Sequence, residues 1–528
     1  MFWEGADTTY IIRAAILTTS ALAYCLWQQP SNLGFYGIAW GIEIVVGGIV
    51  VLRGGSWSEL AIANLTLGLL TQLSGEWRVV TIINYQLPIT HSPYFSSWHV
   101  IPIIYAALGL IFAHNTFTAT TGLYTLAAAL TGVGVGRRKP QFKLLTYLSI
   151  AGISIAAYEL LIYQLLQASG GESGDGIVLL AGLAGAIAIT YRLLSRWLLP
   201  YWRLTFQELL LITHFHWAIG SLLALLSLWV NLSSTGSSIW IGVTAVLAAY
   251  AIWQGRVRDN WVYVGVLQAS GAIAYLLDRT LPESILVSWA AAIACLFAFA
   301  LYILPWRSWG WSKQPWQRSA TILPISIVVL TCWGIGIQSL LLVAAFYAWL
   351  AKAENRIRLS YLSILFTDWA IVRLLIDWNV SELLWYVTVP SGTLLYIAQV
   401  DPSLRSHEDK EKRHILRSLA TGLFCLTAIY QSDTSWWQGI LTIALGFALI
   451  IIGLTLRVRA FLYIGTLTFI IKVLRQLWLF INNYSLLLWG LGIIVGLIFI
   501  WIAATFEARR SQAIALVQYW ISELETWE

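Results

Sequence analysis

Long apolar segments follow one another along the whole chain and predict membrane-spanning helices. The apolar runs are about 17–25 residues long, which is enough for a helix to cross about 30 Å of hydrocarbon. The runs are apolar on every face, whereas the strands of a transmembrane barrel alternate apolar and polar positions. The pattern therefore predicts an all-α, polytopic integral membrane protein with about 19 transmembrane helices.

The composition agrees with this class. Of the 528 residues, 59% are hydrophobic and 11% are charged, whereas soluble proteins carry roughly 25% charged residues. The 30 Trp and 24 Tyr suit helix ends at the level of the lipid headgroups. The first apolar run, from about Tyr10 to Trp27, lacks the basic segment and small-residue cleavage site of a signal peptide, so we expect a retained span.

A basic stretch followed by a Tyr that opens the next apolar run occurs four times. The four stretches read "GVGVGRRKPQFKLLTYLSIAG", "YAIWQGRVRDNWVYVGVLQ", "LAKAENRIRLSYLSILF" and "GLTLRVRAFLYIGTLTF". Their tyrosines lie 116, 98 and 102 residues apart, and they are Tyr147, Tyr263, Tyr361 and Tyr463. A period of this length predicts diverged repeats of four membrane spans.

The repeats define the expected domain organisation. Full or nearly full repeats are predicted at residues 117–235, 236–336, 337–433 and 434–506. Residues 1–116 are expected to hold an N-terminal span and a degenerate first repeat, and residues 507–528 an amphipathic helix on the membrane surface. The first repeat lacks a clear fourth span, so either it is inverted or the segment "WRVVTIINYQL" enters the membrane.

The basic residues predict the orientation in the membrane. Of 31 Lys and Arg, 24 lie in alternate loops from the second repeat onward or at the C-terminal junction, and the opposite loops hold Arg279 alone. The positive-inside rule therefore places the basic loops and the C-terminus in the cytoplasm. Since the charge lies in short loops between spans, nucleic acid is not an expected partner. The topology anchors are Arg137, Arg138, Arg256, Arg258, Arg356, Arg358, Arg457 and Arg459.

Charged residues inside predicted spans are costly and are the candidates for function. Glu159, Arg373 and Arg475 each lie 12 residues after a repeat Tyr. They would form either an ion-pair network that fixes repeat packing, with Glu159 paired to one of the arginines, or a polar pathway. The full set of candidates is Glu43, Glu159, Asp368, Arg373, Asp377, Lys472 and Arg475.

Two of these candidates have a local interpretation. Arg373 and Asp377 lie one helical turn apart, which favours an ion pair between them. Glu43 follows Gly37 and Gly41, two small residues that permit close helix contact, so we expect Glu43 to bond to a neighbouring helix or to carry a proton.

Metal, cofactor and catalytic motifs are not found in the sequence. His214 and His216 lie two residues apart and would point about 200° from each other on a helix, which rules out a shared metal ion. The chain carries no phosphate-binding loop, zinc-protease motif or nucleophile elbow. We therefore predict no enzymatic activity, no cofactor and no metal.

The C-terminal run "YIGTLTFIIKVLRQLWLFINNYSLLLWGLGIIVGLIFIWIAATFEARRSQ" resembles Trp-rich, uncharacterised multi-spanning membrane proteins of cyanobacteria. The resemblance is strongest over roughly the last seventy residues. It implies a plasma or thylakoid membrane location, and it brings no catalytic residues with it.

Two classes of function fit the sequence. The first is a transporter or flippase-like protein that moves a small molecule or a lipid-linked substrate through the bilayer. The alternative is a non-catalytic scaffold or assembly factor for a larger membrane complex, whose partner is another membrane protein. Many spans and intramembrane charges favour the first class, and short loops and abundant aromatic surface favour the second.

Overall fold

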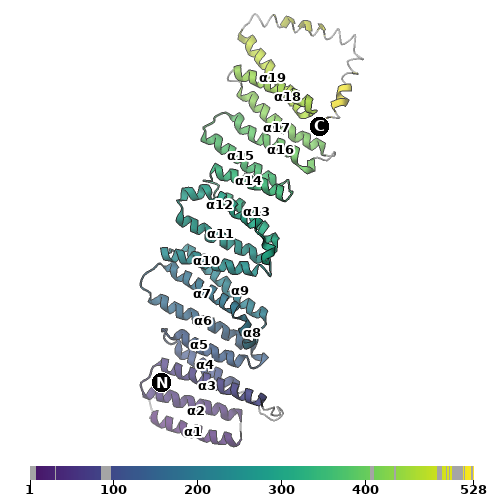
Figure 1. Cartoon of the computed structure of the whole chain (residues 1–528). Coiled ribbons are helices and arrows are strands. Elements are labelled where there is room, and N and C mark those ends of the chain that lie inside the picture. Colours follow the sequence, from purple (N-terminus) through teal and green to yellow (C-terminus); the bar gives the residue numbers. More distant parts are fainter. Residues whose placement is uncertain are drawn as a thin grey trace. The chain divides into compact units, whose positions relative to one another are not determined.

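The computed structural model of the chain is helical wherever it has regular structure (Figure 1). It describes residues 8–29, 31–84, 97–404, 409–432 and 436–483, and short pieces after 483: 490, 492–494, 496–498, 500–501, 515, 518–524 and 527. The helices fall into two compact units, Met1–Leu276 and Leu277–Glu528.

The first unit contains one short helix among ten long ones. The short helix, α8, carries Pro200 and ends at Arg203 in the left-handed region, with φ of 53°. The helices of this unit are α1 (Thr8–Gln28), α2 (Asn32–Leu52), α3 (Trp57–Asn84), α4 (Ser97–Ala113), α5 (Thr121–Gly136), α6 (Lys143–Gln167), α7 (Ser173–Leu193), α8 (Ser195–Trp202), α9 (Phe206–Leu226), α10 (Ser234–Gln254) and α11 (Asn260–Thr280), the last of which runs into the boundary between the units.

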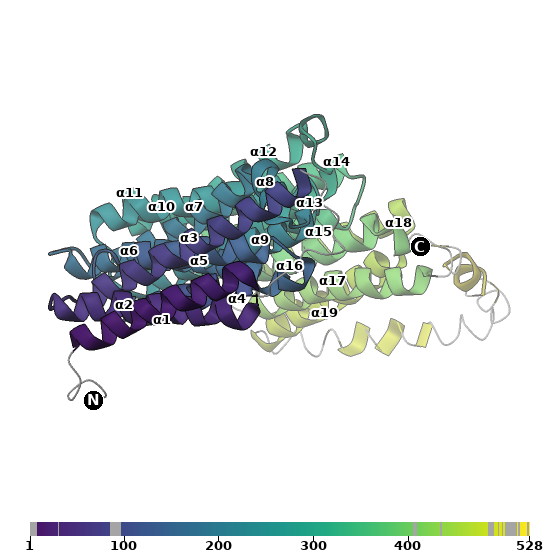
Figure 2. The same ribbon diagram turned by 90° about the horizontal axis from the view of Figure 1, so that it is seen from below.

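Successive helices of the first unit pack side by side as antiparallel hairpins (Figures 1 and 2). The closest pairs are α1 with α2, α3 with α4, α5 with α6, and α7 with α9. Neighbouring pairs are joined through α3 with α5 and α7 with α10. Every substantial contact in the described part of this unit thus links helices that are close in the sequence, as in a repeat protein.

The second unit follows the same plan. Its closest pairs are α12 with α13, α14 with α15, α16 with α17, and α18 with α19, and its core includes Leu340, Val343 and Tyr347. The helices are α12 (Glu283–Ile303), α13 (Lys313–Leu330), α14 (Ile337–Ala353), α15 (Leu359–Asp377), α16 (Leu383–Val400), α17 (Lys410–Gln431), α18 (Trp436–Leu456) and α19 (Arg459–Asn483).

Twelve of the described helices are long and apolar enough to cross a membrane, which identifies an integral membrane protein. Three shorter apolar helices, α4, α5 and α14, lie among them. The predicted span at 486–504 and the amphipathic tail lie largely outside the described residues, so the count of 19 stays a prediction. The twelve are α1, α2, α6, α7, α9, α10, α11, α12, α15, α16, α18 and α19.

The segment "WRVVTIINYQL" does not start a span of its own. Its first eight residues continue α3, which runs unbroken from Trp57 to Asn84. The helix continues because residues 77–84 contain neither Gly nor Pro to end it. The described part of the first 116 residues therefore contains four long helices, α1 to α4, and α3 with α4 form a hairpin.

Glycines on α2 explain how closely α1 and α2 approach. A side chain at Gly41 would overlap the Thr19 hydroxyl of α1, and one at Gly48 would lie 2.6 Å from Ile12. Gly47, on the same helix, has nothing within 4 Å of the corresponding position. The small-residue face expected from Gly37 and Gly41 is thus the face that meets α1, where Gly37 lies against Leu22.

This contact gives a paired test. Gly41→Ala forces a methyl group into the Thr19 side chain and should destabilise the protein by about 1–3 kcal/mol. Gly47→Ala places the same methyl group in open space and should leave stability unchanged or slightly raised, since Ala favours helix. Thermal unfolding of the two variants in one detergent compares them, and equal midpoints would show that the α1–α2 contact is looser than described.

Candidate functional site

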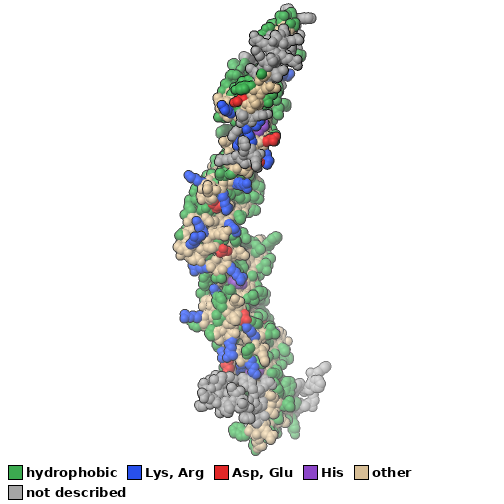
Figure 3. Space-filling view, turned by 90° about the vertical axis from the view of Figure 1, so that its right-hand side faces the viewer, with side chains coloured by type: hydrophobic (Ala, Val, Ile, Leu, Met, Phe, Trp, Pro, Cys, Tyr) green, Lys and Arg blue, Asp and Glu red, His purple; other side chains and the backbone are tan. Residues whose placement is uncertain are grey.

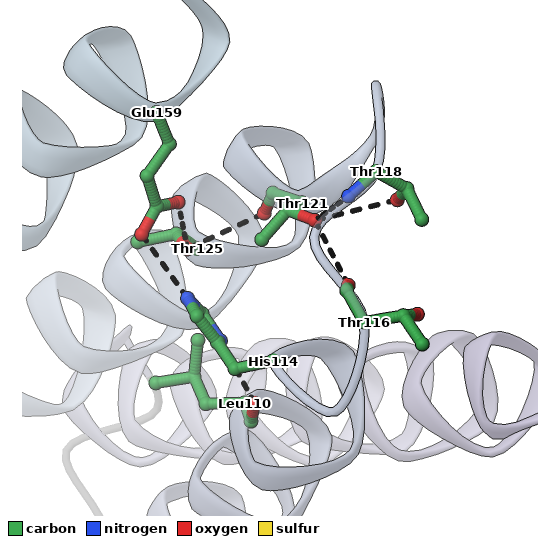
Figure 4. Close-up of polar contacts among 7 residues, drawn as sticks. All are labelled: Leu110, His114, Thr116, Thr118, Thr121, Thr125 and Glu159. Carbon is green, nitrogen blue, oxygen red and sulfur yellow. Dashed lines mark hydrogen bonds and ion pairs between the residues drawn. The ribbon is translucent and has the colours of Figure 1, made fainter. Parts of the chain in front are cut away.

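Glu159 lies at the centre of a polar cluster built from three helices (Figure 4). Its Oε2 accepts a hydrogen bond from the Thr125 hydroxyl of α5 at 2.6 Å, and its Oε1 lies 3.1 Å from Nε2 of His114, just after α4. The Nδ1 of His114 lies 2.9 Å from the Leu110 carbonyl oxygen. The Thr121 hydroxyl holds the adjoining loop by accepting a bond from the Thr118 backbone N–H.

This geometry places a proton between His114 and Glu159. The Leu110 carbonyl can only accept, so Nδ1 of His114 carries a hydrogen. The second contact then has two forms, an imidazolium beside a carboxylate or a neutral imidazole that accepts a hydrogen bond from a protonated carboxyl. The pair can therefore store and exchange one proton without moving a heavy atom.

The pKa of His114 lies above its ordinary value of 6.5. Partial burial acts to lower this pKa, but the hydrogen bond to Glu159, the bond to Leu110 and the negative charge of Glu159 together outweigh it. The side chain of His114 is 42% exposed and that of Glu159 is 15% exposed. The imidazole is thus the more accessible member of the pair.

The described partners of Glu159 are polar groups of the first unit. Glu159 bonds to Thr125 of α5, the other helix of its own hairpin, and to His114, just after α4. Its pairing with Arg373 or Arg475 stays a prediction. The residue at the same repeat position in α11, Tyr275, also bonds to a hydroxyl near the start of the preceding helix: its OH lies 3.0 Å from Oγ of Ser237 on α10. At both places this position links the two helices of a hairpin.

Two other acidic candidates also bond to an adjacent helix. Oε1 of Glu43 accepts a hydrogen bond of 2.9 Å from the amide of Asn64 on α3, as expected for a helix-packing role. Asn64 is fully buried. Asp368 on α15 accepts a hydrogen bond from the Thr393 hydroxyl on α16. The neutral partners Asn64 and Thr393 carry no sequence signal by themselves, because polar uncharged residues are common in these spans.

The remaining candidates form no common site. Within the described residues Arg373 and Asp377 make no ion pair, because Asp377 is the last residue of α15 and its side chain is exposed. Lys472 is 2% exposed within α19, and Arg475 lies about one turn further along the same helix. A His, Cys, Asp and Glu cluster that could hold a metal ion does not occur among the described residues.

The topology anchors of the second repeat lock helices together at one end of the first unit. Arg137 forms an ion pair with Glu76 of α3 at 2.8 Å and lies 4.3 Å from the Tyr201 ring of α8. Arg138 donates to the backbone carbonyls of Trp98 and Gln72 at 2.7 and 2.6 Å. These two arginines therefore join α5 to α3 and α4, in addition to any role in orientation.

The later anchors lie nearer the surface. Arg256, Arg258, Arg356, Arg358 and Arg457 are exposed, and Arg459 is half-buried. Figure 3 looks onto the ends of the helices that carry the basic loops, and Lys and Arg side chains are visible over both units on this face. Arg457 has φ of 53°, a left-handed conformation that ends α18.

A groove of ligand size lies between α6 and α9 in the first unit. It has a volume of about 960 Å³ and is half open, and its walls are mostly aliphatic and aromatic. An ion pair closes its end at the basic loops, where Nζ of Lys143 lies 2.5 Å from Oε1 of Glu208. Tyr158 marks the other end, and its hydroxyl is buried without a hydrogen-bond partner.

Glu208, which lines this groove, belongs to a helix-capping motif that is visible in the sequence. Thr205 and Glu208 form a capping box at the start of α9, in which each side chain bonds to the backbone N–H of the other residue. The motif predicts a helix start, but it does not show that the carboxylate also reaches Lys143 on another helix. His216 lines the groove and its Nδ1 lies 2.9 Å from the Ile212 carbonyl oxygen, whereas Nδ1 of His214 lies 3.1 Å from the Tyr250 hydroxyl. The two histidines thus have separate partners.

Comparison with known proteins adds no family. The chain matches no protein-family model, no curated protein and no solved structure. The resemblance of its C-terminal run to cyanobacterial membrane proteins therefore stays a prediction.

The His114–Glu159 pair predicts a pH-dependent stability. A histidine whose pKa is raised on folding stabilises the protein fully below its unfolded pKa of about 6.5, and this contribution is lost as the pH rises through the higher folded value. Solvent screening of the exposed ring limits the effect to about 0.5–1 kcal/mol. The thermal midpoint in detergent should thus fall as the pH is raised above 6.5.

Two variants test whether the His114–Glu159 pair causes this change of the thermal midpoint with pH. Glu159→Gln should flatten the part of the pH profile that belongs to His114, because the glutamine cannot stabilise an imidazolium by charge. Thr125→Val removes a neutral hydrogen bond from the same carboxylate and should lower stability evenly at all pH values. A Glu159→Gln profile that keeps the full slope would show that another group titrates.

Proposed function

We propose that this protein is a non-catalytic scaffold of a membrane complex. The observation that supports this best is where its intramembrane polar groups bond. Glu43, Glu159 and Asp368 all bond to a hydroxyl or amide on an adjacent helix, and the buried Arg417 of α17 donates to Oε1 of Gln399 on α16 at 2.9 Å. These groups serve helix packing, because each bonds to a helix that is adjacent in the sequence.

The packing of the hairpins also supports a scaffold. Because each hairpin packs on its sequence neighbours, each unit offers long lateral surfaces to the bilayer. Four exposed residues of α10 at helical spacing are small, namely Ser238, Gly242, Ala245 and Ala249, and the larger exposed residues Val246 and Trp253 flank them. Small residues at helical spacing allow a second transmembrane helix to approach closely, which suits a helix of a membrane-protein partner.

The scaffold proposal predicts a stable complex that depends on this surface. Gently extracted wild-type protein should migrate on a native gel as a species larger than the 59.0 kDa chain. Gly242→Ile combined with Ala249→Ile should release the free chain, because the larger side chains prevent close helix contact. Gly271→Ile adds the same bulk in open space on α11 and should leave the complex intact. A wild-type chain that migrates alone would contradict the scaffold.

Transport of a small molecule or a lipid-linked substrate is the second candidate. The observation that favours it is the half-open groove between α6 and α9, whose volume of about 960 Å³ is within the range of ligand sites. The groove walls are apolar, and this suits holding a lipid chain better than passing a polar headgroup.

A vesicle assay separates the two candidates. Purified protein is reconstituted into vesicles that contain a fluorescent phospholipid, and dithionite then bleaches the outer leaflet. A scaffold should leave the inner-leaflet signal at the level of protein-free vesicles. Acceleration of the loss by tenfold or more in sealed vesicles would favour a flippase-like activity and overturn the scaffold as the primary function.

The finer architecture belongs to the same proposal. We infer that the helices form diverged four-helix repeats with about 19 spans, and that the basic loops and the C-terminus face the cytoplasm of a plasma or thylakoid membrane. The matching bonds of Glu159 and Tyr275 support the repeat. If α1 to α4 form the first repeat, then the third long helix of one repeat contacts the first helix of the next in three places: α3 with α5, α7 with α10, and α12 with α14. These matching contacts further support that assignment.

A further inference from the structure

We propose that the groove between α6 and α9 binds one membrane lipid with an anionic headgroup, its chain along the groove and its headgroup at the Lys143–Glu208 end. This inference does not depend on the scaffold function. Its argument rests on the shape of the groove, the charge at its mouth and its mainly apolar wall.

The groove has the length of a lipid chain in a single leaflet. On α6 it runs from Tyr147 to Tyr158, and eleven residues of helix span about 16 Å. Half of the hydrocarbon core is about 15 Å thick. The wall between these tyrosines is formed by Ile150, Ala151 and Ile155 of α6, with Leu211 and Phe215 of α9 opposite. A single acyl or isoprenoid chain fits this depth and this lining.

The mouth of the groove is strongly basic. The two segments that border it, residues 137–143 and 192–208, contain seven Lys and Arg but one acidic residue, Glu208. Arg137 and Arg138 are bound to α3 and α4, so five of these cations remain for the mouth. Arg196 and Arg203 are exposed there, and the side chain of Lys143 is 40% exposed. An anionic headgroup is thus the complementary ligand, whereas a cationic amphiphile would be repelled.

Glu208 does not cancel this preference. Its Oε1 is bonded to Lys143, and its Oε2 accepts a hydrogen bond of 2.9 Å from the backbone N–H of Thr205. The negative charge is therefore balanced by the ammonium group and by the first turn of α9, where acidic side chains are favourable. The Lys143 ammonium has three N–H donors, so it can bind Glu208 and a headgroup oxygen together.

The hydroxyls at the Tyr158 end of the groove are buried within the protein. The Tyr158 OH is buried, and Ser154, one turn nearer the mouth, shares a hydrogen bond of 3.0 Å with the Tyr191 hydroxyl of α7. The chain of a bound lipid would therefore lie along a mainly apolar wall.

The test uses the full-length protein and two photoactivatable lipids. The protein is reconstituted into phosphatidylcholine vesicles that contain a small fraction of diazirine-labelled phosphatidylglycerol or diazirine-labelled phosphatidylcholine. After irradiation, mass spectrometry locates the labelled peptides. Peptides of α6 and α9 should be labelled about fivefold more by the anionic lipid than by the zwitterionic one, the effect expected of roughly one effective basic contact.

Matched variants on α6 separate the groove from the general lipid surface. Ala151→Trp fills the groove and should reduce the labelling of α6 and α9 severalfold. Leu148→Trp places the same ring on the lipid-exposed face, where Leu148 is 62% exposed, and should leave the labelling unchanged. Lys143→Gln keeps a hydrogen-bonding side chain but removes one positive charge from the mouth, and it should bring the labelling yields of the two lipids closer together.

Each outcome decides the inference. Equal labelling by both lipids in the wild type overturns the anionic headgroup. Equal loss of labelling in Ala151→Trp and Leu148→Trp, or no loss in either, overturns the groove as the site. Folding of each variant is checked by its elution as a single species in detergent. The vesicle bleaching assay and the native gel report on transport and scaffolding, so those proposals can fail while lipid binding stands, and the reverse.

Discussion

The lack of water inside a bilayer is the constraint on which this structure depends. Each backbone N–H and C=O must find a partner within the protein, so every described span is a helix. Polar side chains face the same demand, and several of them bond to adjacent helices, as between Glu43 and Asn64 and between Glu159 and Thr125. Close packing between glycine faces then brings helices near enough for these short bonds. Most of the architecture follows from the need to pair these polar groups within each hairpin or with its neighbours.

Much of the fold could be predicted because membrane spans are read from length and hydropathy. The helices α6, α7 and α10 lie where their apolar runs were expected, and the chain is identified as an integral membrane protein. The end of α3 was harder to predict, since the sequence left open whether the segment that contains Arg78 enters the membrane, and the helix continues through it to Asn84. Helix α8 was not predicted, because its eight residues are too few for a membrane span and include Pro200.

The sequence predicted the acidic residues of the candidate site but not the residues that bond to them. Glu159 stood out because a carboxylate in an apolar run is rare, and Glu43 was expected to bond to a neighbouring helix, as it does. Their partners were not foreseeable, since Thr125, Asn64 and His114 become distinctive only when hairpins meet. Opposite charge suggested an arginine for Glu159, and the described structure adds a histidine from the loop after α4 as a partner. The α6–α9 groove depends on the separation of two helices, which no local pattern encodes.

Packing between sequence neighbours has a consequence for how the chain is made. As each hairpin leaves the insertion machinery, the helices that it contacts are already in the membrane, so its polar groups need not wait for distant parts of the chain. Glu159 illustrates this order, because His114 and Thr125 are synthesised before it. Assembly in this manner avoids long-range searches in the bilayer, and it also permits evolution to lengthen or shorten the protein by whole hairpins without rebuilding a shared core.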